Sequence, residues 1–221
     1  LYSVISHDIK NPLYAIISFC ELTKDKIKRG EYEKVAEYNK VIQLSAHNLY
    51  NLIINLLAWS RFHSGKMIAR KETIDANSCI NDTLKLLENS IKHKGINLSI
   101  SKSEITLISA DSNMLGTIIR NLISNAIKFT PANGSILIDS KIDGEKYFLL
   151  VTDSGVGMSS EDIHSILKSD RNQTSLGTDG ESGTGLGLEI VKEFIRLHNG
   201  ELFIESKLGV GSTFTVCLPL K

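Results

Sequence analysis

The sequence lacks several features that would place it in a specialised class of protein. It contains no run of 18 apolar residues and no visible signal peptide, so we expect no segment of it to span or contact a bilayer. Its three cysteines, Cys20, Cys79 and Cys217, lie too far apart for a disulfide framework, and histidine and cysteine form no metal-binding cluster. We interpret the cysteines as buried small side chains in a reducing compartment.

An excess of one charge sign is also missing. The 25 lysines and arginines balance 25 aspartates and glutamates. Affinity for nucleic acid comes largely from neutralising phosphates, so this balance disfavours a general nucleic-acid binder. The chain begins at Leu1, without a methionine and inside a helical pattern. We therefore expect a cytoplasmic fragment, with any membrane anchor located in sequence before it.

Residues 1–64 have a helical pattern with a break at residues 30–32 that is short enough to make the two helices antiparallel neighbours. The second helix carries a heptad seam. Its members are Val35, Tyr38, Ile42, Ser45, Leu49, Leu52, Leu56 and Trp59. Ile53 and Leu57 widen this apolar stripe beyond what one hairpin covers. We therefore expect a homodimer in which two hairpins form a four-helix bundle.

The remainder of the chain alternates between helix and strand signals. Residues 65–72 are polar and begin with glycine, which predicts a linker before a domain at 73–221. Asp143-Gly144 predicts a tight hairpin and residues 207–211 a longer one. Predicted helices lie at 75–93, 112–129, 159–167 and 186–198, and predicted strands at 96–101, 105–109, 134–142, 146–153, 201–206 and 212–218. The pattern predicts a multi-domain protein, a helical hairpin followed by an α/β domain with a mixed sheet and helices on one face.

Glycine is concentrated in one part of the chain, because residues 155–187 hold seven of the 16 glycines. Two clusters stand out, DSGVGM at 153–158 and GTGLGL at 183–188, and the second leads into a predicted helix. Bare N–H groups at a helix start after a glycine-rich lead form a good anion site. Neither cluster has the pattern of a Walker loop or a dinucleotide fingerprint. An ordinary flexible loop is the alternative interpretation.

The predicted helix at 112–129 carries a second polar feature. Asn121, Asn125 and Lys128 recur at spacings of four and three, so they share one helix face. Two carboxamides and an ammonium on one face can bind phosphates and hold a hard divalent cation through carbonyl oxygen. Taken alone, the same pattern also fits a solvated face.

Together these motifs resemble the ATP-binding domain of histidine kinases, which shares the Bergerat fold with gyrase, Hsp90-type chaperones and MutL. NLISNAIK at 121–128 resembles the asparagine box, the clusters at 153–158 and 183–188 resemble the two glycine boxes, and GVGSTF at 209–214 resembles the closing strand motif. One departure is the predicted lid, residues 159–185, which lacks the phenylalanine-rich box that the family often carries.

The resemblance implies a role for each matching residue. Asn125 is expected to coordinate Mg²⁺, Asn121 and Lys128 to engage the phosphates of ATP, and Asp153 to accept the adenine amino proton. Further residues are expected to line the nucleotide, namely Gly155, Gly157, Gly183, Thr184, Gly185, Leu186, Gly187 and Thr213.

His7 differs from the other five histidines, whose positions are explained by surface or capping roles. The sequence SHDIKNPL at 6–13 resembles the phospho-acceptor box of histidine kinases. A neutral imidazole is nucleophilic near pH 7, and the adjoining Asp8 can orient it and accept its proton. The resemblance implies that Asn11 orients a water in a phosphatase reaction. The alternative is that Asn11 only caps a helix beginning at Pro12.

The function expected from this combination is ATP-dependent phosphorylation of His7, followed by transfer to an aspartate of a response-regulator receiver domain. Two other classes share part of the pattern. An ATPase switch of the gyrase type would use the asparagine and glycine boxes but leaves His7-Asp8 and the hairpin unexplained. A non-catalytic scaffold would bind nucleotide or regulator without phosphorylation.

Overall fold

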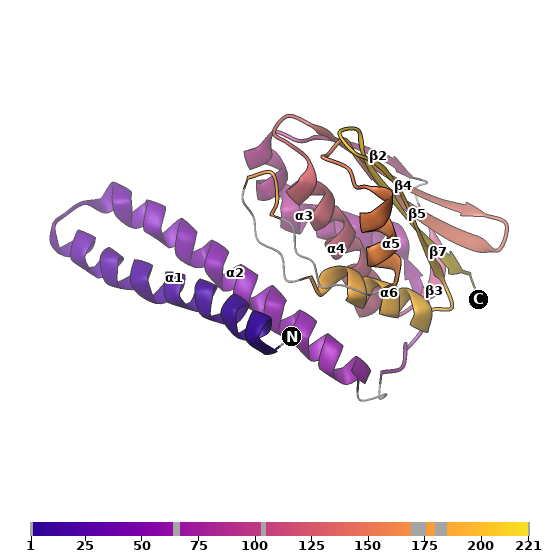
Figure 1. The fold of residues 1–221 in the computed structure, drawn as a ribbon, viewed down its shortest axis with the longest axis horizontal. Coiled ribbons are helices and arrows are strands. Elements are labelled where there is room, and N and C mark those ends of the chain that lie inside the picture. The colour runs from indigo at the N-terminus through magenta and orange to yellow at the C-terminus, as the bar shows by residue number, and fades with distance from the viewer. Residues whose placement is uncertain (1, 64–66, 103–104, 169–175, 180–184, 221) are drawn as a thin grey trace. The chain divides into compact units, whose positions relative to one another are not determined.

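The computed structural model describes residues 2–63, 67–102, 105–168, 176–179 and 185–220. The chain divides into two compact units, Leu1–Gly65 and Lys66–Lys221 (Figure 1). Over the residues described, none of the helices is both long and apolar enough to cross a membrane.

The first unit is an antiparallel pair of helices, α1 (Tyr2–Lys28) and α2 (Tyr32–His63), as the sequence pattern predicts. The turn between them contains Gly30 at φ 72°, a left-handed conformation that glycine adopts without steric cost. Beside this turn the Glu31 carboxylate accepts from Lys26 at 2.9 Å and pairs with Lys34 at 3.2 Å. These hydrogen bonds lower the pKa of Glu31.

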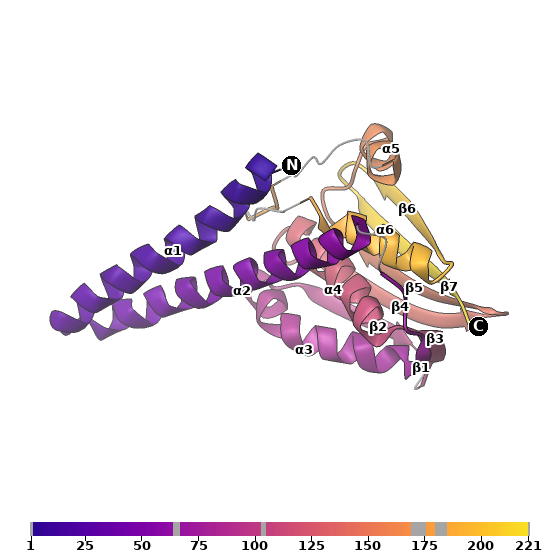
Figure 2. The same cartoon turned by 90° about the horizontal axis from the view of Figure 1, so that it is seen from below.

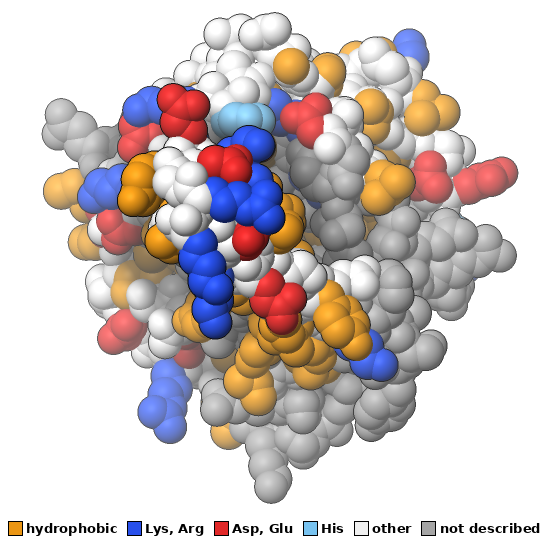
Figure 3. Space-filling model, turned by 90° about the vertical axis from the view of Figure 1, so that its left-hand side faces the viewer, with side chains coloured by type: hydrophobic (Ala, Val, Ile, Leu, Met, Phe, Trp, Pro, Cys, Tyr) orange, Lys and Arg blue, Asp and Glu red, His pale blue; other side chains and the backbone are white. Residues whose placement is uncertain are grey.

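Aromatic packing joins the two helices, because the Phe19 and Tyr38 rings meet edge to face at 5.3 Å between centroids. Helix α1 is continuous through Pro12, so the alternative that a helix begins at Pro12 is excluded. Acidic and basic side chains are interleaved at the end of the hairpin, with apolar side chains exposed among them (Figure 3).

The second unit is an α/β sandwich in which α3, α4 and α6 cover one face of a five-stranded sheet (Figures 1 and 2). The strand order is β2-β4-β5-β7-β6, with β2 parallel to β4 and every other neighbouring pair antiparallel. The helices are α3 (Ala76–Lys94), α4 (Ser112–Phe129), α5 (Ser160–Lys168) and α6 (Gly187–Leu197). The strands of this sheet are β2 (Asn97–Lys102), β4 (Ser135–Asp143), β5 (Lys146–Asp153), β6 (Glu201–Lys207) and β7 (Gly211–Pro219).

The core lies between this sheet and its helices. Strand residues that alternate along β4 and β5 face the helices and are buried, as the period of two predicts. The largest fully buried side chains include Ile80, Leu115, Ile118, Ile119, Leu122, Ile136, Ile138, Tyr147, Leu149 and Ile195. The predicted hairpins are confirmed, with Gly144 at φ 59° in the first and Gly209 at φ 73° in the second.

A small second sheet was not expected from the sequence. Strand β1 (Glu72–Asp75) pairs antiparallel with β3 (Leu107–Ala110), so it overlaps the end of the predicted linker. Four residues are too short a stretch for alternation to be recognised. Asp75 also caps α3 by accepting from the N–H of Asn77 at 3.1 Å, and such a cap predicts a helix start more strongly than a strand end.

His198 connects α6 to the start of α4, the two helices of the second unit that carry motif residues. Its side chain is 1% exposed, and Nδ1 lies 2.6 Å from the Phe194 carbonyl oxygen at the end of α6. Its Nε2 accepts from the N–H of Asp111 at 2.9 Å, and the Asp111 carboxylate caps α4. His198 is therefore a buried connection between α6 and α4 as well as the capping residue that the sequence indicates.

Candidate nucleotide-binding site

Helix α4 presents its predicted polar face beside its core face. Asn121, Asn125 and Lys128 are each partly exposed, whereas the core face is buried at Leu115, Ile118, Ile119, Leu122 and Ala126. The Asn121 amide donates to the Thr117 carbonyl at 2.8 Å, which leaves its Oδ1 directed away from that bond. The Lys128 ammonium lies 4.7 Å from the Phe129 ring centroid. In the part of the chain that the structure describes, the Asn125 amide has no hydrogen-bond partner.

Asp153 lies at the end of β5 and is 6% exposed. Its Oδ1 accepts from the N–H of Gly155 at 2.8 Å and from the N–H of Ser212 at 3.3 Å. Burial raises the pKa of this carboxyl, and the two N–H donors oppose that shift only in part. Among the described residues no donor reaches Oδ2, so this oxygen can accept a hydrogen bond from an amino group.

The first glycine cluster is held closely against backbone from two other elements. A Cβ on Gly155 would lie 2.5 Å from the Phe129 carbonyl oxygen, and one on Gly157, at φ 67°, would lie 2.0 Å from the Lys207 carbonyl oxygen. The N–H of Val156 donates to the same Phe129 oxygen at 3.2 Å. Glycine is therefore required here by contacts within the protein, which fix Asp153 near the end of α4.

The second glycine cluster meets the asparagine face of α4. Gly185 has φ 69°, Leu186 is 2% exposed, and Gly187 is the first residue of α6. A Cβ on Gly187 would lie 2.5 Å from Asn121 Oδ1. Two motifs separated by some 60 residues in the sequence thus meet at a helix N-terminus. Gly183 and Thr184, expected to line the same site, lie outside the described residues.

The structure does not bring Thr213 to this site. Neighbouring strand residues point to opposite faces of a sheet, and Thr213 pairs with Thr152, the two hydroxyls lying 3.0 Å apart. Asp153 pairs with Ser212 on the helix-covered face. Ser212, one position earlier, is therefore the residue of this motif that lies beside Asp153, as the register of β7 against β5 shows.

The arrangement fits a nucleotide and a divalent cation. It combines a buried acceptor at Asp153, amides at Asn121 and Asn125, a cation at Lys128 and a helix start at Gly187, which are the groups that a purine amino group, Mg²⁺ and phosphates need. In the described ranges no three His, Cys, Asp or Glu residues gather as a metal cluster. The side-chain amides of Asn121 and Asn125 supply oxygen atoms of the kind that bind a hard divalent cation.

The phospho-acceptor motif lies in the other unit. His7, Asp8 and Asn11 all belong to α1, and the side chains of His7 and Asp8 lie outside the described residues. Pro12 is inside the same helix, so it cannot donate the hydrogen bond that the carbonyl of Asp8 would otherwise accept. The Asn11 side chain is exposed.

Two residues that no motif contains also contact the end of α4. The Lys94 ammonium donates to the Ile127 and Lys128 carbonyls at 2.9 and 3.0 Å, and Thr178 donates to the Lys128 carbonyl from its N–H at 3.1 Å. A basic residue directly before the αL glycine Gly95 indicates the end of a helix. The sequence does not indicate that Lys94 contacts α4.

Comparison with known proteins divides the chain at the same place as its fold. The family described as histidine kinase-, DNA gyrase B- and HSP90-like ATPase matches residues 110–221, and the His Kinase A (phospho-acceptor) domain matches residues 1–65. The chain is 32% identical to histidine protein kinase DivJ of Caulobacter vibrioides and 30% identical to the circadian input-output histidine kinase CikA of Synechococcus elongatus. Each match covers 98% of this chain, which spans 36% of the first relative and 29% of the second.

Solved structures share the fold. Histidine kinase AdeS of Acinetobacter baumannii superposes with a TM-score of 0.70 at 19% identity, over 97% of this chain and 98% of AdeS. Full-length ShkA, solved in complex with AMPPNP, gives 0.67 at 25% identity over 85% of this chain and 39% of ShkA. ThkA, solved in complex with the response regulator protein TrrA, gives 0.67 at 23% identity over 100% of this chain and 61% of that one. The chain therefore belongs to the histidine kinases, as a phospho-acceptor hairpin followed by an ATPase domain.

Proposed function

We propose that this chain binds Mg-ATP between α4, the end of β5 and the start of α6, and transfers the γ-phosphate to His7. The observation that carries the nucleotide assignment is the meeting of Asn121 with Gly187, because a Cβ at Gly187 would lie 2.5 Å from the Asn121 amide oxygen. The matched ATPase family and the AMPPNP complex of ShkA support it.

Each residue of the site has a distinct task in this proposal. Asp153 accepts the adenine amino proton, since its buried carboxylate is an acceptor that no described donor saturates at Oδ2. Asn125 holds Mg²⁺ through its amide oxygen, and Asn121 and Lys128 bind the phosphates. Bound Mg²⁺ supplies charge neutralisation for the transferred phosphoryl group. Leu186 and the glycines of both clusters shape the walls of the pocket.

His7 is the proposed nucleophile. Its ring nitrogen forms a bond to the γ-phosphorus as the bond to the ADP oxygen breaks, and Asp8 orients the other ring N–H and accepts its proton as the new bond forms. The subsequent acceptor is the aspartate of a receiver domain, as the ThkA complex with TrrA suggests. Asn11 lies one turn from His7 on α1 and orients a water in the reverse, phosphatase reaction. A reaction that consumes ATP places this chain on the cytoplasmic side.

The assay that tests this function is incubation with γ-labelled ATP. Wild type should acquire acid-labile, alkali-stable label, and His7→Gln should acquire none while still binding ATP. The matched control is His93→Gln, since His93 is an exposed histidine in the other unit and should leave labelling unchanged. Released phosphate without label would instead support an ATPase switch, and neither product would support a scaffold.

The neighbours of His7 should give different losses. Asp8→Asn keeps the nucleophile but removes a positioned acid-base group, so autophosphorylation should fall by about 10²–10⁴-fold. Asn11→Ala should retain labelling and lose dephosphorylation of a phosphorylated receiver domain. Initial rates of labelling and of phosphate release measure the two effects. Equal, modest losses in all variants would show that this helix segment is only structural.

We also propose that the chain acts as a homodimer through α1 and α2. Apolar side chains remain exposed on the hairpin, including Tyr14 at 63%, Ile17 at 47%, Tyr50 at 62%, Ile53 at 43% and Leu57 at 50%. A soluble hairpin rarely leaves so many large apolar groups in water. A second hairpin covering them would complete a four-helix bundle.

A further inference from the structure

The C-terminal end of α4 is held by parts of the domain that are distant in sequence. The last carbonyls of a helix have no partner within it and need donors from elsewhere. Thr130 supplies the C-cap, the Ile127 carbonyl accepts from Lys94 Nζ at 2.9 Å, and the Phe129 carbonyl accepts from the N–H of Val156 at 3.2 Å. The end of the asparagine helix is thus in contact with the first glycine cluster.

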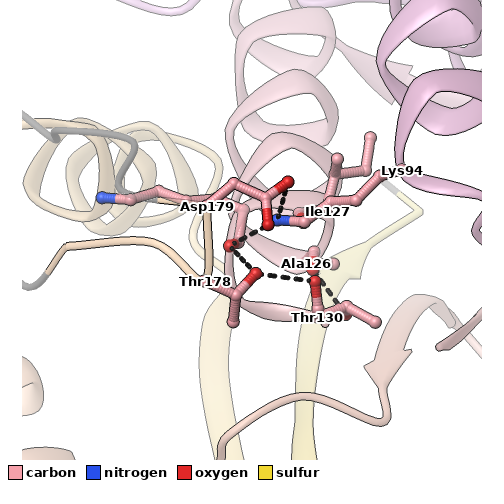
Figure 4. Close-up of polar contacts among 7 residues, drawn as sticks. Lys94, Ala126, Ile127, Thr130, Thr178 and Asp179 are labelled. Carbon is pink, nitrogen blue, oxygen red and sulfur yellow. Dashed lines mark hydrogen bonds and ion pairs between the residues drawn. The ribbon is translucent and has the colours of Figure 1, made fainter. Parts of the chain in front are cut away.

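Three further hydrogen bonds converge on the Lys128 carbonyl. It accepts from Lys94 Nζ at 3.0 Å, from the N–H of Thr178 at 3.1 Å and from the Thr178 hydroxyl at 3.2 Å. The same hydroxyl lies 3.0 Å from the Thr130 carbonyl oxygen. Figure 4 shows Thr178 and Thr130 facing each other below Lys94 and Asp179. The residue whose side chain binds phosphates in our proposal therefore has its backbone fixed from outside its own helix.

Lys94 is the buried charged member of this group, which we call the Lys94 cluster (Lys94, Thr130, Thr178 and Asp179). Its side chain is 3% exposed, and its ammonium lies at the negative end of the α4 dipole. Asp179 approaches it at 3.9 Å with a side chain that is 49% exposed. Such a half-exposed pair contributes little by itself, so the carbonyl contacts are the stronger part of the cluster.

We propose that Lys94 is a positioning residue for ATP binding. Its ammonium fixes the last turn of α4, and with Thr178 it sets where residues 176–179 lie relative to Lys128. The Lys94 cluster therefore holds residues 176–179 against the end of α4, the helix whose side chains bind phosphates in our proposal. This inference rests on the proposed function, because it assumes that ATP binds between α4 and the start of α6.

Thr178→Val is the sharpest test because Thr178 is exposed and its replacement is isosteric. The variant loses the hydroxyl contacts, so Mg-ATP affinity measured by calorimetry on the whole chain should fall by about 3- to 10-fold with little change in Tm. Thr73→Val, an exposed threonine in β1, should change neither quantity. Wild-type affinity in Thr178→Val would overturn the inference. Failure of wild type itself to bind Mg-ATP would contradict the proposed function instead.

Coupling between ATP binding and the Thr178 N–H gives a second measurement, which would not change if Lys94 had a purely structural role. By reciprocity, ATP should slow hydrogen exchange at the Thr178 N–H in wild type, and this protection should disappear in Lys94→Met. Lys92→Met is the matched control, since Lys92 lies in the same helix and its ammonium pairs with the exposed Glu88. Unchanged exchange at Thr178 on adding ATP to wild type would overturn the inference. So would full protection in a folded Lys94→Met variant.

Discussion

Asp153 is the residue of the site where burial and charge oppose each other most directly. Burial raises the pKa of its carboxyl, so the native state binds the proton more tightly than the unfolded chain does. The contribution of this group to folding stability is therefore fully present below the ordinary pKa and is lost as pH rises through the raised value. ATP binding has the opposite requirement, because only the ionised carboxylate is an acceptor at both oxygens.

We therefore expect Mg-ATP affinity to fall as pH is lowered through the raised pKa of Asp153, with binding accompanied by proton release. Asp153→Asn should lower affinity by about 10- to 100-fold at neutral pH and remove this pH dependence, since an amide presents a donor to the adenine amino group. Calorimetry in buffers of different ionisation enthalpy measures both effects.

Asp162→Asn is the control for this prediction. Asp162 is exposed, and hydrogen bonds from Ser159 lower the pKa of its carboxyl. Its replacement should leave ATP affinity and its pH dependence unchanged. An Asp153→Asn variant that binds ATP as wild type does would place adenine recognition elsewhere.

Most residues of the candidate site could be proposed from the sequence because they belong to motifs with fixed spacing. Asn121, Asn125 and Lys128 share a helix face by periodicity alone, and the structure places them so. Thr213 and Ser212 differ by one residue, and only the pairing of β7 with Asp153 decides which of the two faces the helices. Lys94 could not be assigned, because its role depends on where α4 ends relative to α3.

At the scale of whole elements, one glycine in α4 and one at the start of α6 differ in the space around them. Gly116 lies inside α4 with nothing within 4 Å of an added Cβ, whereas a Cβ at Gly187 would displace the Asn121 amide. Gly116→Ala should stabilise the domain by about 0.5–1 kcal/mol, the helix-propensity difference between the two residues. Gly187→Ala should leave Tm nearly unchanged and lower Mg-ATP affinity by about tenfold, since it moves Asn121, a phosphate ligand in our proposal.

Thermal unfolding and calorimetry on the same two variants measure these outcomes. The two variants control for each other, because each adds one methyl group, Gly116→Ala in α4 and Gly187→Ala at the start of α6. Unchanged affinity in Gly187→Ala would show that Asn121 is not a phosphate ligand. A loss of affinity in Gly116→Ala would show that ATP binding responds to any change in α4.

The element pattern explains why helices were easier to predict than the smallest strands. Helix α4 spans residues 112–129 as its caps and periodicity predict, because Asp111 accepts from Asn113 and Met114 at its start. Strand β1 has four residues and exists only through its pairing with β3. Long-range pairing of this kind leaves too little local pattern for a sequence to indicate.

At the scale of the whole molecule, we expect substitutions in the hairpin to change dimerisation without changing ATP binding in the second unit. The hairpin seam joins α1 to α2, whereas the exposed stripe faces the second copy in the proposed dimer. Leu49 is half-buried within the hairpin, so a charge there would disturb the hairpin itself. Ile53 and Leu57 are exposed and lie beside that seam, so charges there should act on the dimer alone.

The double variant Ile53→Glu, Leu57→Glu should therefore be a folded monomer, whereas wild type should have the mass of two chains by light scattering at micromolar concentration. Burying two carboxylates in an apolar bundle core is far costlier than leaving them in water, which drives the dissociation. Leu44→Glu is the control, because Leu44 is 64% exposed on another side of α2 and should leave the dimer intact. Circular dichroism checks that the helices persist, and Mg-ATP affinity should be retained because its site lies in the second unit. A wild-type mass of one chain, or a double variant that remains dimeric, would contradict the proposed four-helix bundle.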